Sequence, residues 1–272
     1  LAGGVPALTR LTGPLAFTER SLRIPGVTGY ALGGPVRLDA DTRADGVINL
    51  VASGRFTPAG VAGALNHPAA TRLLERASGE AAHRTTLTIA PAGFELRAES
   101  DLVGIALNLP APLRKSAGEA LPFTLLRRPT NIEGQDLDVL RATLGRLVDV
   151  QLERRREGAT HRVSRSAISV GEEAALPAYG VSVNLALPRI DLDAWQPLYE
   201  SVSTASARPG TAPPAEEFVP DTVSLRTREL VLDGKLFRNV VLGATRTAEG
   251  LWNANLASDL VSGAIAWQPS RS

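Results

Sequence analysis

The chain has 272 residues, of which 44% are hydrophobic and 21% are charged, and its formal net charge is +1. This composition is that of an ordinary folded protein and excludes global disorder. A nearly neutral chain whose few aromatic residues are not interleaved with basic clusters lacks the features of a nucleic-acid-binding protein. No cysteine is present, which excludes structural disulfides, thiolate chemistry and cysteine-based metal sites.

Alternation of apolar and polar residues predicts strands from the beginning of the chain. The first set lies at residues 15–24, 36–41, 47–53, 85–90, 94–100 and 105–109. The turn signal Asp45-Gly46 falls between two of these runs and is typical of a hairpin. This half of the chain therefore predicts an antiparallel sheet.

One helical insertion is predicted near residues 58–76. Thr57 can cap a helix whose first position is Pro58, and good helix formers follow His67-Pro68. A second helical insertion is predicted at 191–202, where Asp191 and Asp193 suit a helix N-terminus. Both insertions are interpreted as caps on a sheet.

The second half of the chain again alternates. Val148, Val150 and Leu152 are interleaved with polar residues, and so is the run from Val181 to Leu187. Further strands are predicted at 123–127, 137–143, 163–170, 223–228, 236–245 and 251–267, with turn signals at Glu157-Gly158, Asp233-Gly234 and Glu249-Gly250. Residues 203–220 are rich in Ser, Ala, Pro and Gly and predict a flexible loop or linker.

Catalytic and metal-binding patterns are absent from the sequence. His67, His83 and His161 are far apart and have no metal-ligand spacing. Nucleotide-binding glycine motifs and a nucleophile elbow are also missing, and the paired carboxylates lie in loop-like sequence. We therefore expect no enzymatic activity, no metal and no cofactor.

Apolar strand faces without reactive groups have two interpretations. They form the filled core of a β-sandwich, or they line an open surface for an apolar ligand. Trp195, Trp252 and Trp267 are likewise either core and rim residues or ligand platforms, and the residues favour core and rim.

A family resemblance bears on this choice. The stretch SDLVGIALNLPAPLRK, from Ser100 to Lys115, resembles a signature of the AsmA-like proteins of the YhdP family, a serine-led strand that ends in Leu-Pro-x-Pro and a lysine. Four further stretches are similar to the family's patterns, and together they cover most of the chain: Leu11 to Leu38, Ala52 to Val61, Leu176 to Trp195, and Leu236 to Trp267.

The resemblance implies a mainly β fold, a long curled antiparallel sheet forming an apolar groove with two short helical insertions. It also implies a role in phospholipid transport between the inner and outer membranes of Gram-negative bacteria. The implied partners are phospholipid acyl chains, and the implied location is the periplasm, with an inner-membrane anchor outside this segment. The alternative is a non-catalytic periplasmic scaffold domain with a filled core.

These expectations give a division of the chain and a set of site residues. Residues 1–202 are predicted as a β-groove segment, 203–220 as a linker and 221–272 as further groove strands. Because the chain lacks methionine and begins at Leu1, we expect a segment of a longer polypeptide. The candidate groove-lining residues are Ile105, Leu107, Leu109, Val148, Val150, Leu152, Val181, Val183, Leu185 and Leu187.

Overall fold

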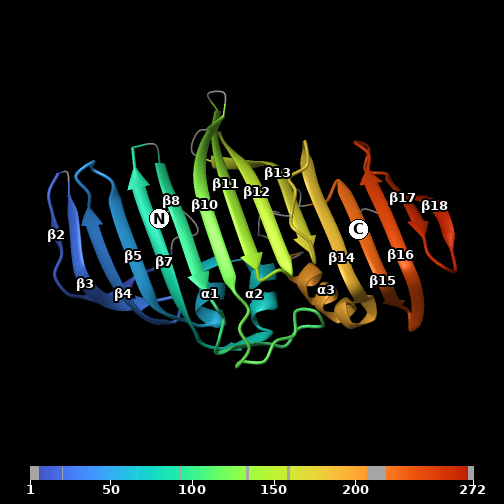
Figure 1. The fold of residues 1–272 in the computed structure, drawn as a ribbon, viewed down its shortest axis with the longest axis horizontal. Coiled ribbons are helices and arrows are strands. Elements are labelled where there is room, and N and C mark those ends of the chain that lie inside the picture. Colours follow the sequence, from blue (N-terminus) through green and yellow to red (C-terminus); the bar gives the residue numbers. More distant parts are fainter. Residues whose placement is uncertain are drawn as a thin grey trace.

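The computed structural model describes residues 6–19, 21–65, 67–91, 93–132, 135–157, 160–206 and 219–268. Within these residues, sixteen strands form one long open sheet, and two short strands form a separate ladder (Figure 1). The strands of the large sheet are β1 (Thr9–Thr12), β2 (Ala16–Phe17), β3 (Leu22–Ala31), β4 (Gly34–Thr42), β5 (Ile48–Phe56), β7 (Ala81–Ala90), β8 (Gly93–Ser100), β10 (Phe123–Ile132), β11 (Gln135–Leu144), β12 (Val148–Glu157), β13 (Thr160–Val170), β14 (Gly180–Asp191), β15 (Thr222–Leu232), β16 (Lys235–Arg246), β17 (Trp252–Ala257) and β18 (Ser262–Trp267). The separate ladder pairs β6 (Ala77–Gly79) with β9 (Ile105–Leu107).

The sheet follows the chain from one end to the other without closing into a barrel. Strands next to each other in the large sheet follow one another along the chain, apart from the omission of β6 and β9 and the pairing of both β1 and β2 with β3. The predicted mainly β, groove-like sheet is therefore confirmed. Its antiparallel character is incomplete, because β13 pairs with β14, and β14 with β15, in parallel. A parallel pair needs a crossover connection, and two connections of this kind occur here, at residues 171–179 and after β14.

The turns between antiparallel strands follow the sequence signals. Asp233 and Gly234 both have positive φ, of 51° and 68°, which is the backbone of a tight hairpin turn between β15 and β16. Asp45-Gly46 and Glu249-Gly250 also lie in turns. The Glu157-Gly158 signal lies partly outside the described residues.

The register of the strands gives the sheet one apolar face. Directly paired residues of neighbouring strands point to the same side of a sheet. One row of paired residues crosses from β4 to β18 and is apolar at every position except Thr85: Leu38, Ala52, Thr85, Ala98, Leu125, Ala142, Val150, Ile168, Val183, Val223, Ala244, Ala254 and Ile265. We call the side that carries this row the apolar face.

The opposite side is the polar face. The row that lies one residue along each strand is polar or small throughout: Arg37, Ser53, Arg84, Glu99, Thr124, Thr143, Asp149, Ser169, Asn184, Ser224, Gly243, Asn255 and Ala264. The alternation in the sequence therefore extends across the whole sheet as two chemically distinct faces.

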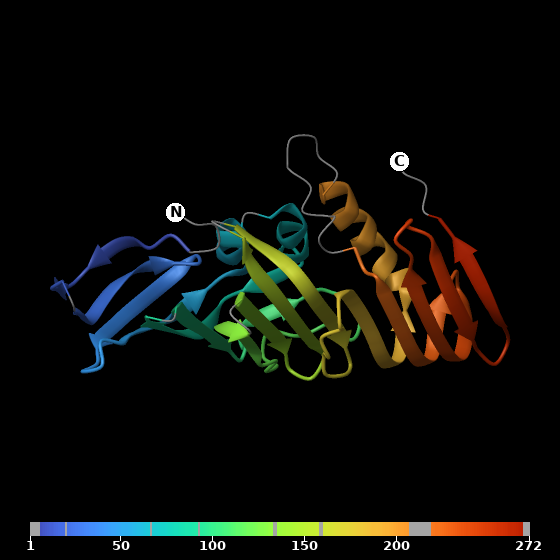
Figure 2. The ribbon, with the colours of Figure 1, turned by 90° about the horizontal axis from the view of Figure 1, so that it is seen from above.

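Three helices, α1 (Pro58–Leu65), α2 (Pro68–Leu74) and α3 (Leu192–Ser206), lie on one side of the sheet (Figure 2). The first predicted insertion is two helices, because His67-Pro68 begins a new one. The ring of His67 accepts a hydrogen bond from the amide of Ala70 at 3.4 Å. The predicted cap Thr57 accepts one from the amide of Gly60 at 3.1 Å. Asp191 caps α3 through the amide of Ala194 at 3.0 Å.

Buried apolar clusters fill the two ends of the apolar face. Near the N-terminus, Val27, Val36 and Leu38 form one cluster with Ala31. Near the C-terminus a second cluster comprises Ile190, Leu225, Leu230 and Val240, with Leu185, Leu187, Leu192, Phe237, Leu242 and Leu256 packed against it. Because Leu192 is the first residue of α3, this contact places the start of that helix on the apolar side.

Candidate functional site

The middle of the apolar face differs from its ends in burial. From Ala52 in β5 to Val223 in β15, every residue of the apolar row is only half-buried, whereas Leu38, Ala244 and Ala254 beyond them are buried. Apolar side chains that are neither covered nor filled in by a second layer form a surface for an apolar ligand. We take the central part of the apolar face as the candidate site.

The structure brings seven of the ten predicted lining residues together on this face. Val150 and Val183 belong to the apolar row itself, joined through Ile168. The other five occupy the flanking positions of β12 and β14: Val148, Leu152, Val181, Leu185 and Leu187. Their common side follows from the register of three neighbouring strands.

The remaining predicted residues lie elsewhere. Ile105 and Leu107 are in β9, which pairs with β6 in the small ladder rather than with a strand of the large sheet. Ile105 and Leu109 are buried, at 3% and 6% exposure, and Leu107 is half-buried. A groove-lining role for these three residues stays a prediction.

Lys115 organises the segment that carries the family-like signature. Its buried ammonium donates hydrogen bonds to the carbonyls of Leu102, Ile105 and Ser116 at 2.8, 2.6 and 3.0 Å. Burial lowers the pKa of Lys115, while the charge of Glu119 opposes this shift. A lysine after an apolar run gives no sign of this role in sequence, because the acceptors are backbone groups brought near by the fold.

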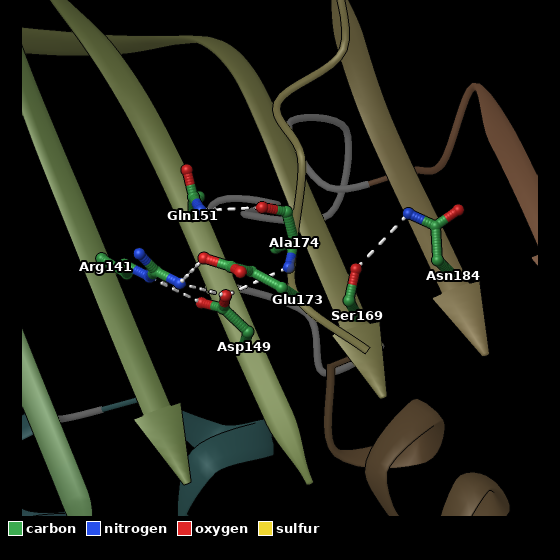
Figure 3. A network of polar contacts seen from close by, with 7 residues as sticks. All are labelled: Arg141, Asp149, Gln151, Ser169, Glu173, Ala174 and Asn184. Carbon is green, nitrogen blue, oxygen red and sulfur yellow. Dashed lines mark hydrogen bonds and ion pairs between the residues drawn. The ribbon is translucent and has the colours of Figure 1, made fainter. Parts of the chain in front are cut away.

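A network on the polar face holds the first crossover connection (Figure 3). Arg141 donates two hydrogen bonds to the buried carboxylate of Asp149, at 3.1 and 2.7 Å, and one to Glu173 at 2.7 Å. Asp149 also accepts from the amide of Ala174, and Gln151 donates to the Ala174 carbonyl. The hydrogen bonds that Arg141 donates to Asp149 and Glu173 raise its pKa. These polar groups are satisfied by the fold itself, so the network has a structural role.

A second ion pair secures the polar face next to that network. Glu153, whose side chain is 9% exposed, accepts hydrogen bonds from Arg165 at 3.0 and 2.8 Å and from Ser164 at 3.0 Å. The hydrogen bonds from Arg165 lower the pKa of Glu153 below its usual 4.5, against the opposing effect of burial.

Glu153→Gln is expected to reduce the free energy of unfolding at neutral pH by about 1–3 kcal/mol. A carboxyl group with a lowered folded-state pKa stabilises the fold above its unfolded-state pKa and loses that effect as the pH falls through the folded value. The difference from wild type should therefore shrink in acid, which urea denaturation at several pH values would measure. Glu80→Gln removes an exposed pair with Arg55 and serves as the control. A pH-independent difference would contradict the assignment.

An apolar cleft of about 800 Å³ lies between α2 and α3. Leu73 of α2 faces Trp195 and Tyr199 of α3 across it, and its lining also includes His67, Ala69, Ala70, Leu192, Asp193, Gln196, Leu198, Val202 and Leu232. Leu192 also packs against the C-terminal cluster, so the cleft adjoins the edge of the apolar face. Helix signals are present in both segments of the sequence, but no pattern in them predicts a cleft.

The tryptophans and histidines noted in the sequence come next, and those whose side chains are described make contacts within the fold. Trp195 donates from Nε1 to the carbonyl of Ala111 at 3.1 Å, and Trp252 stacks on Trp267 with centroids 5.7 Å apart. His83 packs edge-on against Phe56, and burial lowers its pKa. The side chain of His161 lies outside the described residues. Within the described part of the chain, no group of three metal-ligating side chains occurs.

These observations define a class of protein, an extended open β-sheet with one continuous apolar face. The model of the YhdP protein family matches residues 1–272, and the chain belongs to this family. It is a family of envelope-associated bacterial proteins of the lipid-transport type. No curated protein and no solved structure matches the chain. Among the described helices, none is long and apolar enough to cross a membrane.

Proposed function

We propose that this chain is a section of a periplasmic protein that holds phospholipid acyl chains on its apolar face and supports phospholipid transport between the inner and outer membranes. The observation that carries the proposal is the apolar row, which crosses the sheet from Leu38 to Ile265 and is only half-buried in its middle. Membership of the YhdP family supports it.

The physics of an acyl chain fits such a face. Acyl chains have no hydrogen-bonding groups, so they are bound by continuous apolar surface rather than by a few placed polar residues. At about 0.8 kcal/mol per buried CH₂, a ~16-carbon chain would gain on the order of 12 kcal/mol on complete burial. A row of similar aliphatic residues offers similar affinity at successive positions, so a lipid can move along it without meeting one trapping site.

The proposal extends to the parts that act with this chain. Its partners are phospholipids and, through parts outside this chain, the two membranes, with anchoring at the inner one. The lining comprises the apolar row and the predicted residues of β12 and β14. Ile105 and Leu107 of the small ladder, and Leu109 just after it, would contribute as well.

Site-specific photocrosslinking tests the proposal. A photoreactive amino acid at Leu125 or Val150, on the apolar face, is expected to form phospholipid adducts in cells, which mass spectrometry of the purified full-length protein would detect. Thr124 is the matched control, because it precedes Leu125 in β10 and belongs to the polar face. Adducts in equal amounts at Leu125 and Thr124, or at neither, would contradict an acyl-binding face.

A periplasmic scaffold domain with a filled core is the second candidate. The buried cluster around Leu225 and Val240 favours it for the C-terminal strands, since apolar side chains already cover the face there. Under this alternative, protein contacts rather than lipid would occupy the positions at Leu125 and Val150. The same crosslinking experiment therefore separates the two candidates.

A further inference from the structure

A charged cluster interrupts the central apolar face. Arg127, Asp138 and Arg154 lie on that face, because each is two residues along its strand from an apolar residue of the face: Leu125 in β10, Leu140 in β11 and Leu152 in β12. Outside the cluster, the residues paired with them in the neighbouring strands are apolar: Leu96 and Leu140 beside Arg127, Pro129 beside Asp138, and Val163 beside Arg154. Charges in such surroundings lose hydration and are retained when they pair or bind a ligand.

The three side chains share one carboxylate. The Nε of Arg127 lies 2.9 and 3.1 Å from the two carboxylate oxygens of Asp138, and Arg154 forms a second ion pair with the same group. Arg127 also donates to the carbonyl of Phe94 at 2.9 Å, and its guanidinium lies 3.6 Å from the centroid of the Phe94 ring. Asp138 is almost fully buried, with a side chain 4% exposed.

The charges of this cluster do not cancel. Two guanidinium groups face one carboxylate, which leaves the three-residue cluster with one net positive charge. Arg127 has its hydrogen bonds to Asp138 and Phe94, whereas the Nε of Arg154 is buried without a hydrogen-bond partner among the described residues. Arg154 is also the more exposed of the two arginines, at 27% against 16%. Among the described residues its side chain donates only from Nη2 to Asp138, so the exposed part of the guanidinium keeps donors for a ligand although Nε itself is buried.

We propose that Arg154, held by Asp138 and supported by Arg127, binds the phosphate of a phospholipid whose acyl chains lie on the adjoining apolar face. This rests on the proposed acyl-binding function and adds a headgroup to it. Guanidinium groups bind phosphate through paired, charge-assisted hydrogen bonds, which strengthen where water is displaced. Asp138 fixes Arg154 at the surface and reduces the cost of its burial without neutralising both arginines.

Two lipid probes with the same photoreactive acyl chain test the phosphate contact. Phosphatidic acid carries the phosphate, and diacylglycerol lacks it. The purified full-length protein is expected to be labelled by both, with phosphatidic acid favoured by about tenfold, as a charge-assisted hydrogen-bond pair predicts. Equal labelling by both probes would overturn the headgroup site and leave acyl binding intact. Labelling by neither would overturn both proposals.

Arginine variants test whether the charged cluster causes the preference for phosphatidic acid over diacylglycerol. Arg154→Gln should remove the preference for phosphatidic acid, so that phosphatidic acid and diacylglycerol label this variant to a similar extent. Arg154→Lys, which keeps the charge but not the planar fork, should restore part of the preference. Arg165→Gln removes one arginine from the polar face and should leave the preference at the wild-type level. An unchanged preference in Arg154→Gln would overturn the assignment.

A competition arm separates a lipid headgroup from free phosphate. Inorganic phosphate at millimolar concentration should leave phosphatidic acid labelling unchanged, because free phosphate lacks the contribution of the acyl chains. Loss of labelling at that concentration would assign the cluster to free phosphate and overturn the proposal.

Discussion

Replacing Lys115 with methionine is expected to lower the free energy of unfolding by about 3–5 kcal/mol. Three backbone carbonyls, those of Leu102, Ile105 and Ser116, would lose a charged donor. The Leu102 and Ser116 carbonyls also accept from the amides of Ile105 and Glu119, so the loss is that of three charge-assisted hydrogen bonds. Hydrogen bonds to a charged donor contribute more than the average one, and water has little access to a site where the lysine is 5% exposed. Equilibrium denaturation in urea, followed by circular dichroism, would measure the change.

The chain supplies its own control for this experiment. Lys235 is the other lysine of the sequence and the first residue of β16. Its side chain is exposed and donates no hydrogen bond among the described residues. Lys235→Met should change the free energy of unfolding by less than about 0.5 kcal/mol. Similar stabilities for Lys115→Met and wild type would show that the three carbonyls do not depend on this ammonium.

Val183→Asp is expected to reduce lipid adducts at Val150 and Leu125 by at least about tenfold. The change puts a carboxylate into the apolar row, next to Ile168 and Val223. An acyl chain lying across it would desolvate an unpaired charge, at a cost of several kcal/mol, and each 1.4 kcal/mol corresponds to a factor of about ten in binding. Crosslinking yield and an envelope-integrity assay in cells would both report the effect.

The matched control for this change is Asn184→Asp. It introduces the same carboxylate one residue further along β14, on the polar face, where Asn184 contacts Ser169 and Ser224. Adduct yields at Leu125 should remain close to the wild-type level. Unchanged yields in a folded Val183→Asp protein would exclude this part of the apolar row as a lipid surface.

Strand alternation in the sequence predicts which residues of β12 and β14 share the apolar face. Val148, Val150 and Leu152 alternate with polar residues, and short turns pair each strand with the next, so their common side follows from local pattern alone. The run from Val181 to Leu187 alternates in the same way, and its parallel pairing with β13 places it on that side. Side chains alternate between the two faces of a sheet whether the neighbouring strand runs parallel or antiparallel.

Contacts between distant parts of the chain account for what the sequence pattern does not predict. The parallel pairing depends on the 171–179 connection, which Arg141, Asp149 and Gln151 hold from another part of the sheet. Strand β9 is only three residues long, and its place opposite β6 follows from packing rather than alternation. Asp138 lies 11 and 16 residues from its two arginine partners, so their cluster emerges only once the register is known.

The apolar row runs across the strands, so a change in strand length and a change in strand number alter different dimensions of the apolar face. The row crosses the strands, and each strand contributes one residue to it, so strand length controls the width of the surface and strand number controls its span. An added hairpin would extend the span by about 10 Å, twice the spacing between strands, and leave the width unchanged. A one-residue insertion within a strand would instead turn that strand's polar residues toward the row. Changes in length are therefore expected to be tolerated as whole hairpins, within the turns at the sheet margins, or where a β-bulge absorbs the extra residue, as at the register shift between β12 and β13.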